Sequence, residues 1–172
     1  GSITLATPLP AVTKQMIIDA TTAPGYAAGG APAVTVDAAG KSGLVFGQGS
    51  DSSQLLGVAL TRATGDGVTI AAQSVTINAN YIGITPAGAA AGNTGAGVYL
   101  APGSADNVIG LNESGDSGAV SNVISGNGGD GIRLQGSSSN TLVANRVGTN
   151  PAGTSAVPNK GNGLAIVKDS NG

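Results

Sequence analysis

The chain has 172 residues, of which 9% are charged and 2% aromatic, with a formal net charge of −2 and neither histidine nor cysteine. This composition disfavours nucleic acid as a partner, because no basic surface can neutralise phosphates, and it excludes disulfides, thiolate metal sites and a histidine-based catalytic triad. No apolar run reaches the roughly 18 residues of a membrane span, so no membrane insertion is predicted, and no cofactor is predicted either.

The first 40 residues are predicted to form irregular first coils of a repetitive structure. Three short apolar stretches predict strands at residues 3–5, 16–19 and 33–36. The segment AGKSG (39–43) resembles the end of a phosphate-binding loop, but Thr35 stands where that loop needs its first glycine. We therefore expect a connection between two strands here, and no nucleotide site.

From Lys41 onward the chain contains a repeat built around two glycines separated by one residue. The second glycines of four clear copies are spaced by 30, 34 and 32 residues, and Gly43 belongs to a fainter copy. After each glycine pair, apolar residues occupy every second position, which is the period of a short strand. Repeats of this length indicate a solenoid, so residues 1–172 are predicted to form a single domain of about five to seven coils. The four copies are GDGVTI (65–70), GAGVYL (95–100), GDGIRL (129–134) and GNGLAI (161–166).

A second apolar stretch follows each glycine repeat and is predicted to form a further strand. These stretches are residues 54–60, 75–82, 107–110 continued by 122–125, and 141–147. Asparagine recurs at matching places in them. In stacked coils such asparagines can bond to one another and to the turn backbone, with about 1 kcal/mol of net stabilisation for each satisfied bond. We therefore predict structural ladders made of Asn80, Asn122 and Asn145, and of Asn107 and Asn140.

Three inserts rich in Gly, Pro, Ser and Asn interrupt the repeats, at residues 83–94, 110–121 and 148–162. They are predicted to leave the coils as loops at one or two corners. Neither end of the chain has an obvious polar cap, and the last residues, KDSNG (168–172), stop part-way through a repeat. Because solenoids cover their ends, we expect either part of a longer chain or a unit whose ends stack on neighbours.

Several of these segments resemble a known family, the right-handed parallel β-helix repeats of large secreted and surface proteins of bacteria, whose fold is related to that of pectate lyases. The resemblance is carried by NVISGNGGDGIRL (122–134), NRVGTNPAGTSAVPN (145–159), and the ITLATPLPAV and APGY stretches near the start. It implies an all-β, right-handed parallel β-helix and an extracellular or cell-surface location. It is a poor guide to activity, because the family includes polysaccharide lyases, hydrolases, adhesins and repeats with no known reaction.

One outward column of side chains is the first candidate for a binding surface. The repeats place Thr69, Tyr99, Arg133 and Ala165 on the same face, one in each coil. Tyr99 and Arg133, with Asp130 close by, could present a ring and a guanidinium to a sugar or an acidic polymer. The simpler interpretation is a cross-strand pair that stabilises an exposed sheet. Tyr81 and Arg146 are predicted to share a second outward position.

The acidic residues are the only candidates for catalysis. Asp66 and Asp130 occupy equivalent corners two repeats apart, roughly 10 Å from each other, which is near the upper limit for an inverting glycosidase. Asp beside glycine is also a favoured turn residue, and we favour that interpretation. GDSG (115–118) resembles a serine-protease motif in a chain without histidine, and GNGGDG (126–131) resembles calcium-binding repeats with the wrong order of Gly and Asp.

The sequence therefore favours a non-enzymatic role: a structural or adhesive β-helix segment of a bacterial extracellular or cell-surface protein that could associate end to end into a filament. Its expected partners are other copies of itself or a surface polysaccharide. The alternative is a carbohydrate-active module that binds or cleaves an acidic polysaccharide. Dispersal of the acids at corners would favour the rod, and convergence of three or more would favour the enzyme. A phage tail-spike-like segment is a third hypothesis, which would require trimer contacts.

Overall fold

The structure, a computed structural model, describes residues 1–110 and 122–168 and contains sixteen short strands and no helix within those residues. The strands are β1 (Ser2–Thr4), β2 (Ile17–Asp19), β3 (Val34–Asp37), β4 (Leu44–Phe46), β5 (Gln54–Leu56), β6 (Val58–Thr61), β7 (Val68–Ile70), β8 (Thr76–Asn78), β9 (Tyr81–Ile82), β10 (Val98–Leu100), β11 (Val108–Gly110), β12 (Val123–Ile124), β13 (Ile132–Gln135), β14 (Thr141–Val143), β15 (Arg146–Val147) and β16 (Leu164–Val167).

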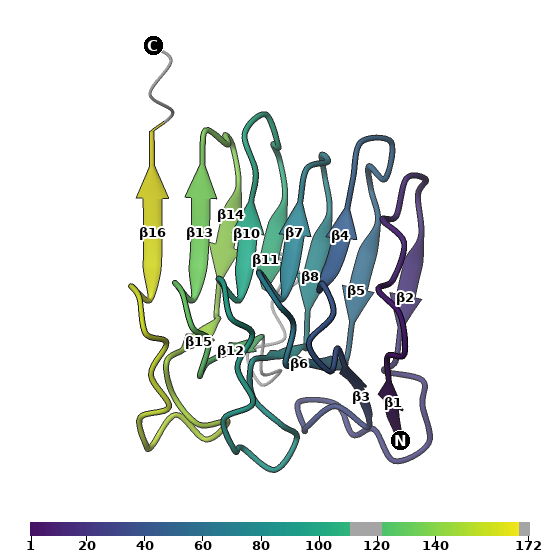
Figure 1. Cartoon of the computed structure of the whole chain (residues 1–172), viewed down its shortest axis with the longest axis vertical. Helices are drawn as coiled ribbons and strands as arrows, with labels where there is room; N and C mark the ends of the chain where they lie inside the picture. The colour runs from purple at the N-terminus through teal and green to yellow at the C-terminus, as the bar shows by residue number, and fades with distance from the viewer. Residues whose placement is uncertain (111–121, 169–172) are drawn as a thin grey trace.

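The strands form three sheets in which every neighbouring pair is parallel. Sheet 1 has the order β1-β3-β6-β9-β12-β15, sheet 2 the order β4-β7-β10-β13-β16, and sheet 3 the order β2-β5-β8-β11-β14. The chain passes from sheet 1 to sheet 2 to sheet 3 and then returns to sheet 1 one step further along (Figure 1). The described residues thus make five coils and the first two strands of another. The predicted all-β parallel β-helix is confirmed.

All three strands predicted in the first 40 residues are confirmed within one residue, as β1, β2 and β3. The AGKSG segment lies between β3 and β4, as expected. The first coil lacks a full strand in sheet 2 and contributes only a bridge from Val12 to Phe46. Its irregularity therefore reflects one missing strand rather than a different fold.

The interior of the helix is filled by columns of aliphatic side chains that repeat from coil to coil. Val68, Val98 and Ile132 are in register on neighbouring strands of sheet 2, and so are Ile70 and Leu100. All five are at most 2% exposed. Burying one such side chain stabilises the fold by about 2 kcal/mol, so the alternating pattern after each glycine pair supplies much of the driving force for stacking.

The prediction of a single second strand in each repeat is wrong. Residues 54–60 form two strands, β5 in sheet 3 and β6 in sheet 1, with a bend at Gly57. Residues 75–82 likewise divide into β8 and β9 around Ala79, whose φ is +58°. In residues 75–82 the alternation of apolar residues continues from Ile77 through Ala79 to Tyr81, so the sequence pattern does not reveal the change of sheet there. Glycine favours the left-handed backbone and adopts it at Gly57, but at the second corner alanine adopts it.

The second glycine of each repeat allows two coils to approach closely. A Cβ atom on Gly67 would lie 2.8 Å from the carbonyl oxygen of Gly97, and one on Gly97 would lie 2.7 Å from that of Gly131. Such a contact is too short for any side chain. The second glycines of successive repeats therefore form a column in which the backbone of one coil packs directly on the backbone of the next.

Both predicted asparagine ladders are present at corners of the helix. The amide nitrogen of Asn80 donates to Oδ1 of Asn122 at 3.2 Å, and that of Asn122 donates to Oδ1 of Asn145 at 2.9 Å. The amide nitrogen of Asn107 donates to Oδ1 of Asn140 at 3.0 Å. The amide nitrogens of Asn80, Asn107, Asn122 and Asn145 also donate to backbone carbonyl oxygens, as Asn122 does to Ile77, whereas Nδ2 of Asn140 is buried without a partner.

A third ladder, which was not predicted, follows the corner between sheets 1 and 2. Asn93 donates to Asn127, and Asn127 donates to Asn159, each amide contact measuring 2.9 Å. The signal was present in the sequence, because each of these asparagines stands four positions before the second glycine of its repeat. Two of the three, Asn93 and Asn159, lie within inserts predicted to be loops, which separates them from the strand pattern.

Loops cover the outer face of sheet 1, which corrects one prediction. Tyr81 and Arg146 share one position two coils apart, as predicted, because Val123 pairs with both. Tyr81 is not exposed, however: it is 4% exposed and packs with Ala59, Ile84 and Val123 in a second apolar cluster. The inserts after β9 and β15, and the segment between β2 and β3, leave the coils around this sheet (Figure 1). Burial raises the pKa of the Tyr81 phenol, and the guanidinium of Arg146 opposes that shift.

Candidate functional site

The outer face of sheet 2 carries the predicted column of side chains. Thr69, Tyr99, Arg133 and Ala165 are aligned on four neighbouring strands, with Tyr99 directly between Thr69 and Arg133. The register therefore brings together the ring and the guanidinium that the sequence placed on one face. Nothing in the geometry alone shows that they contact a ligand, so that role stays a prediction.

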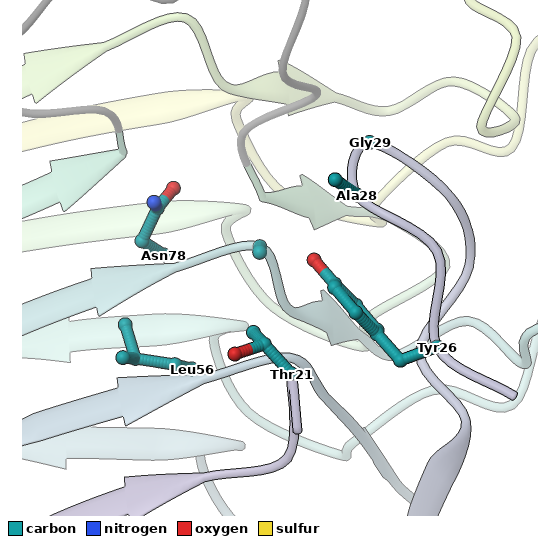
Figure 2. A pocket seen from close by; sticks show the side chains of 7 residues that line it. Thr21, Tyr26, Ala28, Gly29, Leu56 and Asn78 are labelled. Carbon is teal, nitrogen blue, oxygen red and sulfur yellow. The ribbon is translucent and has the colours of Figure 1, made fainter. Parts of the chain in front are cut away.

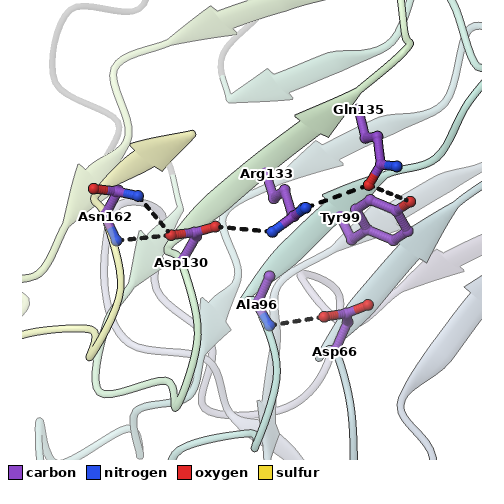
Figure 3. Close-up of polar contacts among 7 residues, drawn as sticks. All are labelled: Asp66, Ala96, Tyr99, Asp130, Arg133, Gln135 and Asn162. Carbon is purple, nitrogen blue, oxygen red and sulfur yellow. Dashed lines mark hydrogen bonds and ion pairs between the residues drawn. The ribbon is translucent and has the colours of Figure 1, made fainter. Parts of the chain in front are cut away.

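Tyr99 and Arg133 are joined through Gln135, a residue that the sequence analysis did not single out. The Tyr99 hydroxyl donates to Oε1 of Gln135 at 3.3 Å, and Nη2 of Arg133 donates to the same oxygen at 3.4 Å (Figure 3). Gln135 extends β13 by one residue beyond the apolar alternation, on the same side of the strand as Arg133. Its amide holds the two larger side chains in one polar cluster.

Asp66 and Asp130 lie beside this cluster and bond to the coil that follows each of them. The backbone N–H of Ala96 donates to Oδ1 of Asp66 at 2.7 Å, and the backbone N–H of Asn162 donates to Oδ1 of Asp130 at 2.7 Å (Figure 3). Oδ2 of Asp130 lies 3.7 Å from Nη1 of Arg133. The favoured interpretation of the two acids as turn residues is thus supported by specific hydrogen bonds.

A shallow pocket of about 290 Å³ opens among these residues. Its walls are Asp66, Gly95, Ala96, Tyr99, Gly129, Asp130 and Arg133. It therefore combines the predicted surface residues Tyr99, Arg133 and Asp130 with the Asp66 corner, which the sequence analysis had treated separately.

The other four described acids are dispersed: Asp106 is exposed at a bend, and the remaining three bond to nearby groups. Asp19 accepts the backbone N–H of Thr21, and Asp51 accepts that of Gln73. Asp37 accepts the backbone N–H of Ala39 and forms an ion pair with Arg62. Within residues 1–110 and 122–168, no three His, Cys, Asp or Glu side chains gather as they would around a metal ion. Glu113, Asp116, Asp169 and the GDSG motif lie outside the described residues.

A larger pocket of about 450 Å³, also not predicted, lies at the opposite corner between sheets 3 and 1. The segment between β2 and β3 forms one wall, and Figure 2 shows the Tyr26 ring extending from this segment between Thr21 and Ala28. The ends of β5 and β8 supply Leu56 and Asn78. Oδ1 of Asn78 is buried without a hydrogen-bond partner. Tyr26 belongs to the APGY stretch, but no repeat pattern connects it to strands so far along the chain.

The ionisation of Tyr26 provides a test of this corner. Burial, and secondly the Asp19 carboxylate, raise the pKa of its phenol. Because the pKa is raised in the folded state, the stabilisation linked to the neutral phenol is fully present below the ordinary tyrosine pKa of about 10. It is lost as pH rises through the folded-state pKa. We expect the free energy of unfolding, measured by urea titration at increasing alkaline pH, to fall less steeply in Tyr26→Phe than in the wild type.

The contribution of Asp19 is separable from that of burial. Asp19→Asn should lower the Tyr26 pKa toward its ordinary value, as followed by the ring carbon shifts of labelled tyrosine in NMR spectra. Asp51→Asn, which also removes an acid that bonds to turn backbone, is the control and should leave that titration unchanged. Equal titration of Tyr26 in all three proteins would show that Asp19 has no electrostatic effect on it.

Comparison of the chain with known protein families, curated proteins and solved structures finds no match. No helix in the described part of the chain is long and apolar enough to cross a membrane. The parallel β-helix is therefore the level at which this protein is classified, and its function is argued from its own residues.

Proposed function

We propose that this chain is a non-enzymatic structural or adhesive rod of a bacterial extracellular or cell-surface protein. The observation that carries the proposal is the use of the described carboxylates: five of the six, those of Asp19, Asp37, Asp51, Asp66 and Asp130, each accept a backbone N–H at a corner of the helix, and the sixth, Asp106, is exposed at a bend. A glycosidase needs one carboxyl group free to donate a proton and a second poised near it. Carboxylates dispersed along the corners support a scaffold role instead.

We further propose that the rod associates end to end with another copy of itself. Within residues 1–110 and 122–168, the large apolar side chains that are notably exposed all lie in the first coil or the last two: Ile3, Leu9, Met16, Ile17, Val143, Leu164, Ile166 and Val167. Ile166 is 76% exposed although it stands in the column of Ile70 and Leu100, which are fully buried further along the helix. A second copy stacked in register would bury these side chains and pair the open strand edges.

Sedimentation velocity over a wide range of concentrations tests the association, with electron microscopy to show the particles. We expect rods that lengthen with concentration in the wild type and single rods in Ile166→Lys, because a buried, unpaired ammonium would oppose stacking. Thr69→Lys, on the side of the rod, is the matched control and should still lengthen. Wild-type rods that stay single at every concentration would overturn self-association and point to further coils of the same polypeptide as the cover.

Carbohydrate binding is the second candidate function, and the pocket beside Tyr99 is the observation that favours it. A shallow site with a ring, a guanidinium and carboxylates is suited to hydroxyl groups. Cleavage of an acidic polysaccharide has less support, because Asp66 and Asp130 are both held by backbone N–H groups.

A further inference from the structure

The pocket on sheet 2 exists because one side chain is missing from a column of polar residues. The residue between the two glycines of each repeat is Asp66, Ala96, Asp130 and Asn162 in successive coils. Each aspartate accepts the backbone N–H of the equivalent residue in the next coil. Ala96 has no side-chain oxygen with which to accept the N–H of Asp130. The pocket lies at this interruption.

Glycine stands beside each carboxylate of the column. Gly95 follows Asp66 by one coil, and a Cβ atom there would lie 2.5 Å from Oδ1 of Asp66. Gly161 stands in the same relation to Oδ1 of Asp130, also at 2.5 Å. A Cβ atom on Gly129, one coil beyond Ala96, would meet backbone atoms of Gly95 and Ala96 but no carboxylate. The column therefore lacks a carboxylate at Gly129, and the pocket opens beside this glycine.

The groups around the space can both donate and accept hydrogen bonds. The guanidinium of Arg133 lies 3.7 Å from Oδ2 of Asp130, which is longer than a direct hydrogen bond, so both groups keep bonding capacity. Asp66 uses Oδ1 for the N–H of Ala96, which leaves Oδ2 for another donor. The Tyr99 ring supplies an apolar surface beside these polar groups.

We infer that this pocket binds a single neutral sugar ring, such as the hexopyranose unit of a glycan. Hydroxyl groups can donate to the carboxylates and accept from the guanidinium, whereas a ligand with only donors or only acceptors satisfies half of the site. Two carboxylates and one guanidinium give the pocket a net negative charge, which opposes a uronic acid. A volume of about 290 Å³ is at the small end of ligand sites, which suits one ring. The inference rests on the second candidate function, carbohydrate binding at this pocket, and is independent of the rod role, since the site lies on the side of the rod.

The probes that test the site are methyl glucoside, methyl mannoside and methyl galactoside, each compared with its uronic acid counterpart. Binding is followed by the ring carbon shifts of labelled tyrosine, with Tyr99→Phe assigning the Tyr99 signal among the three tyrosines. We expect at least one neutral methyl hexoside to shift the Tyr99 signal, with its uronic acid counterpart binding roughly tenfold more weakly. No shift with any neutral hexoside, or equal binding of the uronic acid, would overturn the inference.

Ala96→Asn is the decisive variant, because it should fill the pocket while repairing the column. Its Oδ1 would accept the N–H of Asp130, so we expect a melting temperature at or above that of the wild type together with a roughly tenfold or greater loss of hexoside affinity. Ala165→Asn, on the same face outside the pocket, is the control and should bind normally. Unchanged affinity in Ala96→Asn would rule out this site.

Arg133→Gln keeps the inference testable if Ala96→Asn does not fold. The side chain is partly exposed and its contacts are surface contacts, so the fold should tolerate the change. A roughly tenfold loss of hexoside affinity is expected, and full affinity would contradict the inference. Sedimentation velocity tests the end-to-end association of the rod separately from hexoside binding, so either proposal can fail without the other.

Discussion

Gly97→Ala is expected to be among the most destabilising substitutions in this chain. The added methyl group would lie 2.4 Å from Cγ2 of Ile124 and 2.7 Å from the carbonyl oxygen of Gly131. The isoleucine could move, but the carbonyl belongs to the strand pairing of the next coil and is fixed by it. We expect a loss of about 3 kcal/mol or more in the free energy of unfolding, at the upper limit for overpacked cores, as measured by urea denaturation.

Gly163→Ala is the matched control, because Gly163 occupies the same column in the last described coil. The nearest heavy atom to an added Cβ there is Cγ1 of Val147, at 3.6 Å, which is an ordinary contact. We expect a change within about 0.5 kcal/mol. If both substitutions cost the same, coil-to-coil contact would not be the reason for glycine in this column, and the intrinsic preference of the residue would have to explain it.

The solenoid could be predicted from the sequence because its signals are periodic. Val68, Val98 and Ile132 follow their glycines at the same offset, and this offset places them in one buried column. The change of sheet at Ala79 could not be predicted in the same way. Its φ of +58° is left-handed, a conformation that alanine does not favour by itself, so the residue type gives no signal of the corner and stacking of the coils has to hold it.

The candidate site shows the same division between local pattern and tertiary structure. The alignment of Tyr99 with Arg133 follows from repeat spacing and was predictable. The pocket beside Ala96 depends on an absence in a column, which becomes visible only once the hydrogen bonds of Asp66 and Asp130 to the following coil are known. The larger pocket at Tyr26 depends on a non-repetitive segment that folds back over distant strands, for which periodicity offers no information.

Asn127→Ala is the second substitution for which a large effect is expected. Asn127 is fully buried in the middle of its ladder, where Oδ1 accepts from the Asn93 amide and Nδ2 donates to Oδ1 of Asn159 and to the carbonyl oxygen of Ile82. Truncation would leave these three partners without one hydrogen bond each in a site closed to water. At about 1 kcal/mol or more for each, we expect a loss of roughly 3 kcal/mol in urea denaturation.

Asn127→Asp separates hydrogen bonding from side-chain size, since the two side chains have almost the same shape. An aspartate can still accept from Asn93, but its ionised form would face the oxygens of Ile82 and Asn159. Burial without a cation should raise the pKa of this carboxyl group in the folded state. The loss of unfolding free energy relative to the wild type should therefore be smallest at acidic pH and should grow as pH rises. A pH-independent loss would contradict this account.

The control for the ladder is Asn162→Ala at the exposed corner occupied by Asp66, Ala96 and Asp130 in earlier coils. Its amide donates only to Oδ1 of Asp130, which also accepts the backbone N–H of residue 162 and keeps that bond in the variant. We expect a change within about 0.5 kcal/mol. A large loss in Asn162→Ala and a small one in Asn127→Ala would mean that exposed corners hold the coils together. The reverse result would assign that role to the buried ladders, where each amide bridges two coils and cannot be replaced by water.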